Sequence, residues 1–358
     1  MRTRVLLLAT AVLLLSTPSA IAARVTLREQ SQLVAEARGL TGVLVQNPRG
    51  WVELHPSADG RIHVKALKLS TASESSRARH FSRLTRVETA TEAGRFVVRV
   101  RYPQHQTVRV DFWRFLKGGF DFPGVEVRLS IEVPPRLAAE LEAASGDLKT
   151  FDLAAPQSLQ TASGDIEVRG ASAPVSVLTT SGSIVGSDLA GAHVRSVSGD
   201  VTLDGVRGPL EVATTSGDIE VRGVADSLRF ATVSGDIRVD RAPRGIRAGT
   251  TSGDIHVEGM AAGLVRLRST SGEVRLGVER GLRGVDVRTI SGDIELRLAE
   301  GLGCALTLTS TGGALDSSVP LQLRTVSRHA MSGVVRGGGP PVVLHSASGD
   351  IAVTGGGR

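Results

Sequence analysis

Residues 210–223 read LEVATTSGDIEVRG, and this stretch decides the fold. Leu210 and Val212 alternate with polar residues, and Ile219 and Val221 resume the alternation after a Ser-Gly-Asp turn. Alternation with a period of two is typical of β-strands that bury one face. The stretch therefore predicts two short strands joined by a tight corner.

The Ser-Gly-Asp phrase recurs through the second half of the chain. Spacings between successive copies or variants, from Ser145 to Ser291, are 18, 18, 17, 18, 18, 18, 19 and 20 residues. So short a period indicates a solenoid, in which each unit buries its apolar face against its neighbours. We expect glycine to supply a positive φ at each corner and aspartate to bond nearby amides. The expected turn residues are Gly164, Asp165, Gly199, Asp200, Gly217, Asp218, Gly235, Asp236, Gly253, Asp254, Gly292, Asp293, Gly349 and Asp350.

The predicted fold is all-β: a right-handed parallel β-solenoid of about 18-residue coils with an N-terminal β cap. Residues 141–358 would form the repeat solenoid, and residues 23–140, which lack the phrase, would cap its open end. Irregular spacing near 304–313 and 321–333 predicts a bulge and an inserted loop. Inward threonine and serine hydroxyls are expected to form a ladder from coil to coil.

Residues 1–22 have the pattern of a secretory signal. Arg2 and Arg4 precede an apolar run from Val5 to Leu15, and Ala20-Ile21-Ala22 fits the small-x-small cleavage pattern. A membrane anchor is the alternative, but a run of about 11 residues is shorter than the roughly 20 that span a bilayer. We expect cleavage after Ala22 and an extracytoplasmic mature chain (periplasm, cell surface or secreted) without a transmembrane segment.

Several motifs together resemble a known family. They are the signal, the Asn47-Pro48-Arg49-Gly50 turn, a Val125–Pro135 strand of the V-x-L-x-I-x-V-P type, and tandem T-x-S-G-D-I-x-V units. They resemble the exported bacterial "putative-adhesin" family of unknown function, over roughly residues 30–358. The resemblance implies a right-handed β-solenoid outside the cytoplasm with a role in adhesion or envelope processes, and it supplies no catalytic residues.

Composition limits the classes of molecule that this protein is expected to bind. The 358 residues carry a net charge of +6, or 6 − 2 = +4 after removal of Arg2 and Arg4, and arginine provides nearly all the positive charge. We expect an anionic polysaccharide, an envelope lipid or an envelope protein as partner, and no nucleic acid. The single cysteine, Cys304, excludes an internal disulfide, and its apolar surroundings predict a buried position.

Outward arginines form the first candidate site. Arg229, Arg247 and Arg266 occupy the same position in three successive coils, with Arg268 and Arg288 two residues further along the next strands. Guanidinium groups bind phosphate and carboxylate bidentately, so these residues would suit docking of an anionic polymer. A solvated face without a partner is the alternative.

A second candidate lies at residues 102–122, which hold six of the chain's 11 aromatic residues. Trp113 and Phe115 would be exposed anchors for a partner or a membrane surface, or core residues of the N-terminal cap. Changing both to serine separates the two interpretations, because only core residues would lower the unfolding midpoint.

Catalytic and metal sites are not expected. The corner aspartates would line one edge as turn residues; a calcium ladder is the alternative, but calcium needs six to eight oxygens. The eight histidines show no metal spacing. We therefore expect a non-enzymatic adhesin or envelope scaffold without cofactor or metal, the alternative being a polysaccharide-processing enzyme of the parallel β-helix type.

The signal pattern makes a direct prediction. N-terminal sequencing of the exported protein should begin at Ala23, because Ala20-Ile21-Ala22 is the predicted cleavage pattern. Recovery of a membrane-bound form that retains Met1 would contradict it.

Overall fold

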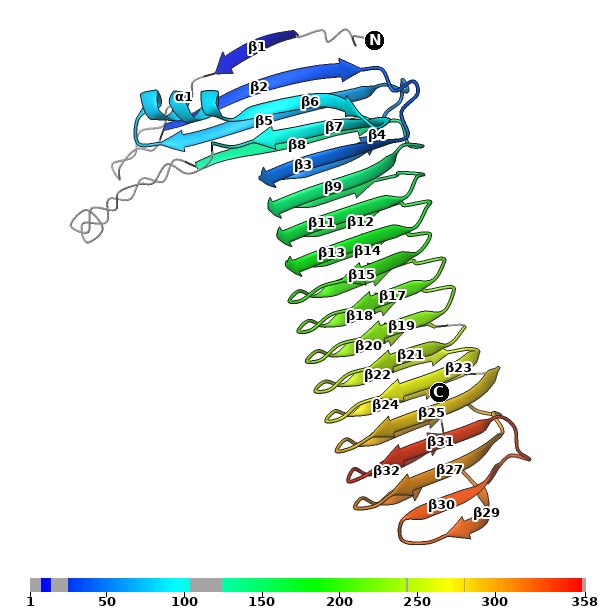
Figure 1. Cartoon of the computed structure of the whole chain (residues 1–358). Coiled ribbons are helices and arrows are strands. Elements are labelled where there is room, and N and C mark those ends of the chain that lie inside the picture. The colour runs from blue at the N-terminus through cyan, green and yellow to red at the C-terminus, as the bar shows by residue number, and fades with distance from the viewer. Residues whose placement is uncertain (1–7, 14–24, 104–123, 243, 280, 356–358) are drawn as a thin grey trace, which may run out of the picture. The chain divides into compact units, whose positions relative to one another are not determined.

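The computed structural model describes residues 8–13, 25–103, 124–242, 244–279 and 281–355. The chain forms two compact units, Met1–Glu167 and Val168–Arg358. Each unit has strands in two sheets, here called sheet A and sheet B, and the only helix of the described residues is α1 (Ser75–Leu84) (Figure 1). The all-β prediction is confirmed.

The first unit has mixed sheets, and its strand β8 (Gly124–Val133) coincides with the Val125–Pro135 strand that the sequence predicts. Sheet A runs β1 (Leu8–Leu13), β2 (Val25–Ala35), β5 (Ile62–Ala72), β8 (Gly124–Val133), β4 (Val52–Pro56) and β10 (Leu148–Phe151). Sheet B runs β6 (Arg86–Glu92), β7 (Arg95–Arg101), β3 (Gly42–Arg49), β9 (Ala138–Ser145) and β11 (Gln157–Ser163). Strand β12 (Ile166–Arg169) crosses the boundary between the units.

The predicted signal is described only in part. Leu8–Leu13 forms β1, which pairs antiparallel with β2, and the rest of residues 1–22 lies outside the described residues. Helix α1 packs Ala78 against Leu27 and Ala72.

The second unit is mostly parallel. Its sheet A runs β14 (Ile184–Ser187), β16 (Val201–Asp204), β18 (Ile219–Arg222), β20 (Ile237–Asp240), β22 (Ile255–Met260), β24 (Val274–Val278), β26 (Ile294–Leu298), β32 (Ile351–Gly355) and β28 (Leu315–Ser317). Its sheet B runs β13 (Val175–Ser181), β15 (Ala192–Arg195), β17 (Leu210–Ala213), β19 (Leu228–Ala231), β21 (Ile246–Gly249), β23 (Gly263–Arg268), β25 (Leu282–Thr289), β31 (Pro341–Ser346), β27 (Cys304–Ser310), β30 (Ala330–Val335) and β29 (Leu321–Val326).

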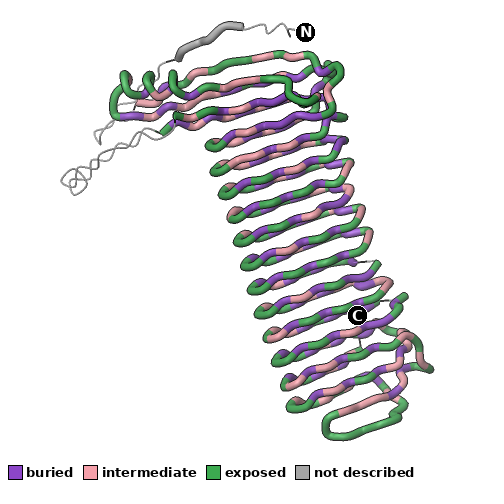
Figure 2. The backbone as a smooth tube through the Cα atoms, in the orientation of Figure 1, coloured by how far each residue is buried: buried purple, intermediate pink, exposed green. Residues whose placement is uncertain are grey.

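The core lies between the two sheets of each unit. Buried and exposed residues alternate along the strands, as period-two patterning requires (Figure 2). In β18 and β20 the paired residues Ile219 and Ile237 are both fully buried, and so are Val221 and its partner Val239. Each such side chain contributes roughly 1.5–3 kcal/mol by leaving water.

The Ser-Gly-Asp corners stack glycine on glycine. A Cβ atom built on Gly217 would come within 2.2 Å of the carbonyl oxygen of Gly199, and one built on Gly235 within 2.1 Å of that of Gly217. A side chain here would force neighbouring coils apart. Among the corner glycines, all in the described part of the chain, only Gly164 (φ 155°) and Gly182 (φ 126°) have a positive φ. Close approach, rather than the expected positive φ, is therefore the main reason for glycine.

Each corner aspartate can link its coil to the next. The carboxylate of Asp200 accepts a hydrogen bond from the backbone N–H of Asp218 at 3.0 Å. We call this series the aspartate ladder, and the same bond recurs in the pairs Asp147–Asp165, Asp218–Asp236, Asp236–Asp254, Asp254–Glu273 and Asp293–Asp350. The ladder gives these backbone N–H groups a partner outside their own turn.

The inward hydroxyls are buried, and several of them bond from coil to coil as predicted. Thr250 donates to the carbonyl oxygen of Gly235 at 3.3 Å, and Ser346 donates to that of Gly292 at 3.1 Å. The bonds therefore join neighbouring coils through glycine carbonyls, not through other hydroxyls. Three further hydroxyls find no partner among the described residues: Ser196, Thr214 and Thr232.

The second corner of each coil, opposite the Ser-Gly-Asp corner, contains one residue in the left-handed conformation. Successive coils place Asp188 (φ 55°), Gly205 (φ 68°), Gly223 (φ 61°) and Arg241 (φ 60°) there. Glycine adopts this conformation freely, whereas a residue with a Cβ atom loses roughly 1–2 kcal/mol. Arg241 is thus a strained position.

In each unit, one coil is inserted into the stack of strands out of its order in the sequence. In the second unit β31 pairs with β25 and β27, so the last coil of the chain lies between two earlier ones. In the first unit β3 pairs with β7 and β9, so an early coil lies between two later ones. Beyond β27, β30 and β29 form an antiparallel hairpin with a register shift between Leu323 and Thr325, in place of the expected inserted loop.

The close stacking of the corner glycines predicts that adding one methyl group at a corner destabilises the protein. We expect Gly217→Ala to lower the free energy of unfolding by roughly 1–3 kcal/mol, because the added carbon overpacks the corner. Gly249→Ala is the matched control, since its Cβ atom would meet nothing closer than the Arg268 carbonyl oxygen at 3.8 Å. Urea unfolding followed by circular dichroism measures both variants, and equal losses would contradict the steric explanation.

Candidate binding site

Outward residues of sheet B in the second unit bring the predicted arginines into register. Arg229 on β19 pairs with Arg247 on β21, which pairs with Arg266 on β23. Parallel in-register pairing stacks identical positions about 4.8 Å apart. The three guanidinium groups therefore form one row across neighbouring strands.

A second, shorter row lies beside the first. Arg268 on β23 pairs with Arg288 on β25, which pairs with His345 on β31. We call the five residues Arg229, Arg247, Arg266, Arg268 and Arg288 the arginine face. All five side chains are exposed.

Most side chains of the arginine face form no ion pair with the residues that the structure describes. Arg288 Nε lies 2.9 Å from Asp286 Oδ1. The other four side chains form no hydrogen bond or ion pair with any residue that the structure describes: Arg229, Arg247, Arg266 and Arg268. Neighbouring unit charges at this spacing repel by up to about 1 kcal/mol in water, so an anion that spans them would relieve that repulsion.

Sheet A of the same unit shows the opposite arrangement. Three of its outward arginines pair with a carboxylate two residues earlier, on the same strand or at the preceding corner, as in the pair Arg222–Glu220. Arg238 lies 2.9 Å from Asp236, and Arg275 lies 2.6 Å from Glu273. Charge is therefore compensated locally on sheet A and left unpaired on much of the arginine face.

The second candidate is outside the described residues. Trp113 and Phe115 fall in residues 104–123, so the choice between cap and anchor stays a prediction. Tyr102, the one aromatic of 102–122 that is described, donates its hydroxyl hydrogen towards the Arg49 carbonyl oxygen at 2.5 Å, with Asn47 Oδ1 at 3.2 Å. Burial raises the pKa of Tyr102 and keeps the phenol neutral.

A pocket of about 570 Å³ in the first unit was not found from the sequence. Arg49, Trp51, Glu126 and Asp147 are among the residues that line it. The available signal was the Asn-Pro-Arg-Gly turn at 47–50, which stands where other coils have Ser-Gly-Asp. The sequence pattern identified the turn but not the pocket, because its walls come from distant segments.

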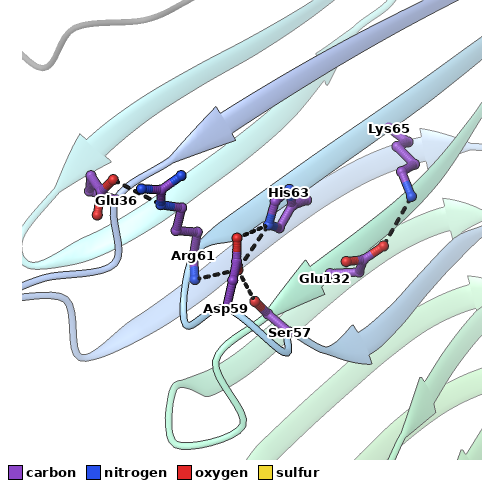
Figure 3. A network of polar contacts seen from close by, with 7 residues as sticks. All are labelled: Glu36, Ser57, Asp59, Arg61, His63, Lys65 and Glu132. Carbon is purple, nitrogen blue, oxygen red and sulfur yellow. Dashed lines mark hydrogen bonds and ion pairs between the residues drawn. The ribbon is translucent and has the colours of Figure 1, made fainter.

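A serine, an aspartate and a histidine meet at the turn between β4 and β5 (Figure 3). Asp59 accepts hydrogen bonds from His63 Nε2 at 3.0 Å, from the backbone N–H of Arg61 at 3.0 Å and from Ser57 Oγ at 2.8 Å. These bonds, that of His63 first, hold the pKa of Asp59 below its usual range. The Ser57 hydroxyl donates to the carboxylate and not to the imidazole, so the group stabilises a turn and does not form an activated nucleophile.

Flanking ion pairs extend this network. Arg61 Nε lies 3.1 Å from Glu36, and Lys65 Nζ lies 3.0 Å from Glu132 (Figure 3). Glu36, Arg61 and Lys65 are exposed and Glu132 is half-buried, so each pair contributes at most about 1 kcal/mol.

Other chemistry-bearing groups are dispersed. Within the described ranges, no three His, Cys, Asp or Glu side chains lie close enough together to hold a metal ion. Cys304 is fully buried as predicted, and burial raises the pKa of its thiol. None of the helical segments that the structure describes has the length and apolar character needed to cross a bilayer.

Comparison with known proteins gives one family match. The family model described as Toastrack DUF4097 matches residues 104–249 and 246–354. A search of curated proteins finds no match.

Solved structures give weak likenesses. A "putative adhesin" from Parabacteroides distasonis is 10% identical, with a TM-score of 0.35 over 91% of this chain and 97% of its own. A "putative adhesin" from Parabacteroides merdae is 11% identical, with a TM-score of 0.31 over 92% and 96%. A "putative lipid binding protein" from Parabacteroides distasonis is 10% identical, with a TM-score of 0.27 over 92% and 97%. Scores of this size do not establish a common arrangement of the chain.

The aspartate ladder predicts stability without metal. We expect EDTA to leave the thermal midpoint unchanged, because each ladder carboxylate already accepts a backbone N–H, whereas a metal bound only to the folded protein would raise the midpoint by mass action. Differential scanning fluorimetry with EDTA, then with added calcium, makes the test. A drop of several degrees that calcium reverses would support the calcium alternative. Asp218→Asn, which keeps the acceptor oxygen, should also unfold at the wild-type temperature.

Proposed function

The chain belongs to the Toastrack DUF4097 family, and we propose that this member is a non-enzymatic exported scaffold that binds an anionic polysaccharide of the cell envelope. The arginine face is the proposed binding surface. In this proposal the fold is a right-handed solenoid of about 18-residue coils, the corner glycines and aspartates serve only its stacking, and residues 23–140 cap it. The signal pattern of residues 1–22 supports export.

One observation carries the proposal: four guanidinium groups of the arginine face form no hydrogen bond or ion pair with any described residue, whereas Arg222, Arg238 and Arg275 on sheet A of the same unit form ion pairs. Unpaired like charges held in a row are unfavourable unless an anion binds them. Bidentate guanidinium–carboxylate bonds are short and directional, so a row of them suits a polymer with repeated carboxylates.

Geometry favours a linear polymer over a lipid surface. The arginines follow the stacking direction of the strands, one coil after another, on a regular sheet face. Large exposed apolar side chains near this row are single ones, such as Leu264, rather than a contiguous patch that would insert into a membrane.

Charge removal tests the surface. The triple variant Arg229→Ser, Arg247→Ser and Arg266→Ser should bind polygalacturonate at least about tenfold more weakly and with a flatter salt dependence, since exposed charge contacts are screened by salt. The matched control replaces Arg222, Arg238 and Arg275 on sheet A, which removes the same charge and should leave binding near the wild-type level. Binding titrations at several salt concentrations measure the affinity of each variant and its salt dependence.

Three outcomes would overturn the proposal. The first is an equal loss of polygalacturonate affinity in the two triple variants. The second is binding of the wild-type protein to anionic lipid vesicles but not to polygalacturonate. The third is release of reducing ends from the polymer during incubation with the protein. The last would favour the enzyme alternative.

A further inference from the structure

The pocket of the first unit occupies a corner where the repeat is replaced. Arg49 pairs with Ser145, and Gly50 stacks on Gly146, so Asn47–Trp51 takes the place of a Ser-Gly-Asp corner. Arginine stands where other coils have serine, and Trp51 stands where they have aspartate. These two side chains are therefore not part of the aspartate ladder, which starts at Asp147.

Glycines let the backbones of neighbouring strands approach closely beside the pocket. A Cβ atom on Gly146 would overlap the carbonyl oxygen of Gly50 at 1.7 Å, and one on Gly50 would lie 2.2 Å from that of Val127. Gly50 also has a φ of 99°, which residues with a Cβ atom rarely adopt. Glycine is therefore required at both positions for this close packing, and the adjoining pocket of about 570 Å³ lies in the range of small-ligand sites.

Buried hydrogen bonds hold the wall in place. Asn47 is fully buried, and its Nδ2 donates to the Val127 carbonyl oxygen at 2.7 Å. Tyr102 binds the same corner through the Arg49 carbonyl oxygen. The backbone that carries Arg49 and Trp51 is thus fixed in advance, which lowers the entropic cost of binding a ligand.

The lining has the composition that recognises a sugar ring. Trp51, the one tryptophan among the described residues, lines the pocket together with Leu69, and both offer apolar surface. Thr71 and Ser145 add hydroxyl groups, and Asp147 adds a carboxylate. A pyranose has an apolar face and a rim of hydroxyls, so an apolar wall with a few placed polar groups complements it.

Arg49 specifies an acidic sugar. Its guanidinium forms no hydrogen bond or ion pair with any residue in the described ranges. The nearby carboxylate of Glu126 does not neutralise it, because Glu126 accepts a bond from Arg128 Nε at 2.8 Å. A free guanidinium at the edge of a sugar-sized pocket matches a ring carboxylate.

We infer that this pocket binds a single uronic acid residue, with Arg49 on its carboxylate and Trp51 against its ring. This inference, like the proposed function, concerns an acidic glycan, but the pocket residues differ from those of the arginine face and belong to the other unit. The two therefore fail independently: the pocket takes one sugar, whereas the arginine face takes a run of charges.

Titration calorimetry of the full chain with glucuronate and with glucose tests the pocket. The wild-type protein should bind glucuronate more tightly than glucose. Arg49→Gln should reduce glucuronate affinity about tenfold and remove the preference, because one charge-assisted hydrogen bond is lost. Arg38→Gln is the matched control: Arg38 is an exposed arginine of the same unit that does not line the pocket, and its loss should change nothing.

Trp51→Ala should weaken both sugars, and a thermal midpoint checks that the variant is folded. If Trp51→Ala does not fold, Arg49→Gln still decides the question. The inference is overturned if glucuronate does not bind the wild-type protein, or if Arg49→Gln binds it unchanged. Loss of glucuronate binding in the arginine-face triple variant would also overturn it, since that would place the sugar on the other surface.

Discussion

The stacking of glycine on glycine at the Ser-Gly-Asp corner is the constraint on which the rest of the structure depends. A carbonyl oxygen lies about 2 Å from where each Cβ atom would be, as for Gly217 over Gly199. Only this approach lets the aspartate of one coil accept the N–H of the next and the inward hydroxyls reach a glycine carbonyl. One residue without a side chain thus permits two sets of side-chain bonds between coils.

In-register stacking acts on the outside as well as on the core. The same pairing that places Ile219 beside Ile237 places Arg229 beside Arg247. On sheet A, Arg222, Arg238 and Arg275 each form an ion pair with a carboxylate two residues earlier, whereas four arginines of sheet B form none with the described residues. Because exposed repulsion costs little in water, a fold of this kind can keep an uncompensated row for a ligand.

At the ends of the repeat, corner side chains no longer take part in the coil-to-coil bonds of the aspartate ladder. The coils inserted out of order are β3/β4 in the first unit and β31/β32 in the second, and antiparallel pairing begins one strand beyond each of them. At the first of these coils Asn47 takes over the link between neighbours through Val127 and Tyr102. Arg49 and Trp51 are then free to line a pocket.

The sequence alone determined the all-β class, the two strands per coil, the buried hydroxyls and the row formed by Arg229, Arg247 and Arg266. These features follow from periods of two and about 18 residues, which are local properties of the chain. Tertiary structure decided the steric role of the corner glycines, the inserted coils and the pocket around Trp51. Each depends on contacts between residues far apart in sequence, as when Gly50 meets both Val127 and Gly146, and no periodicity encodes such contacts.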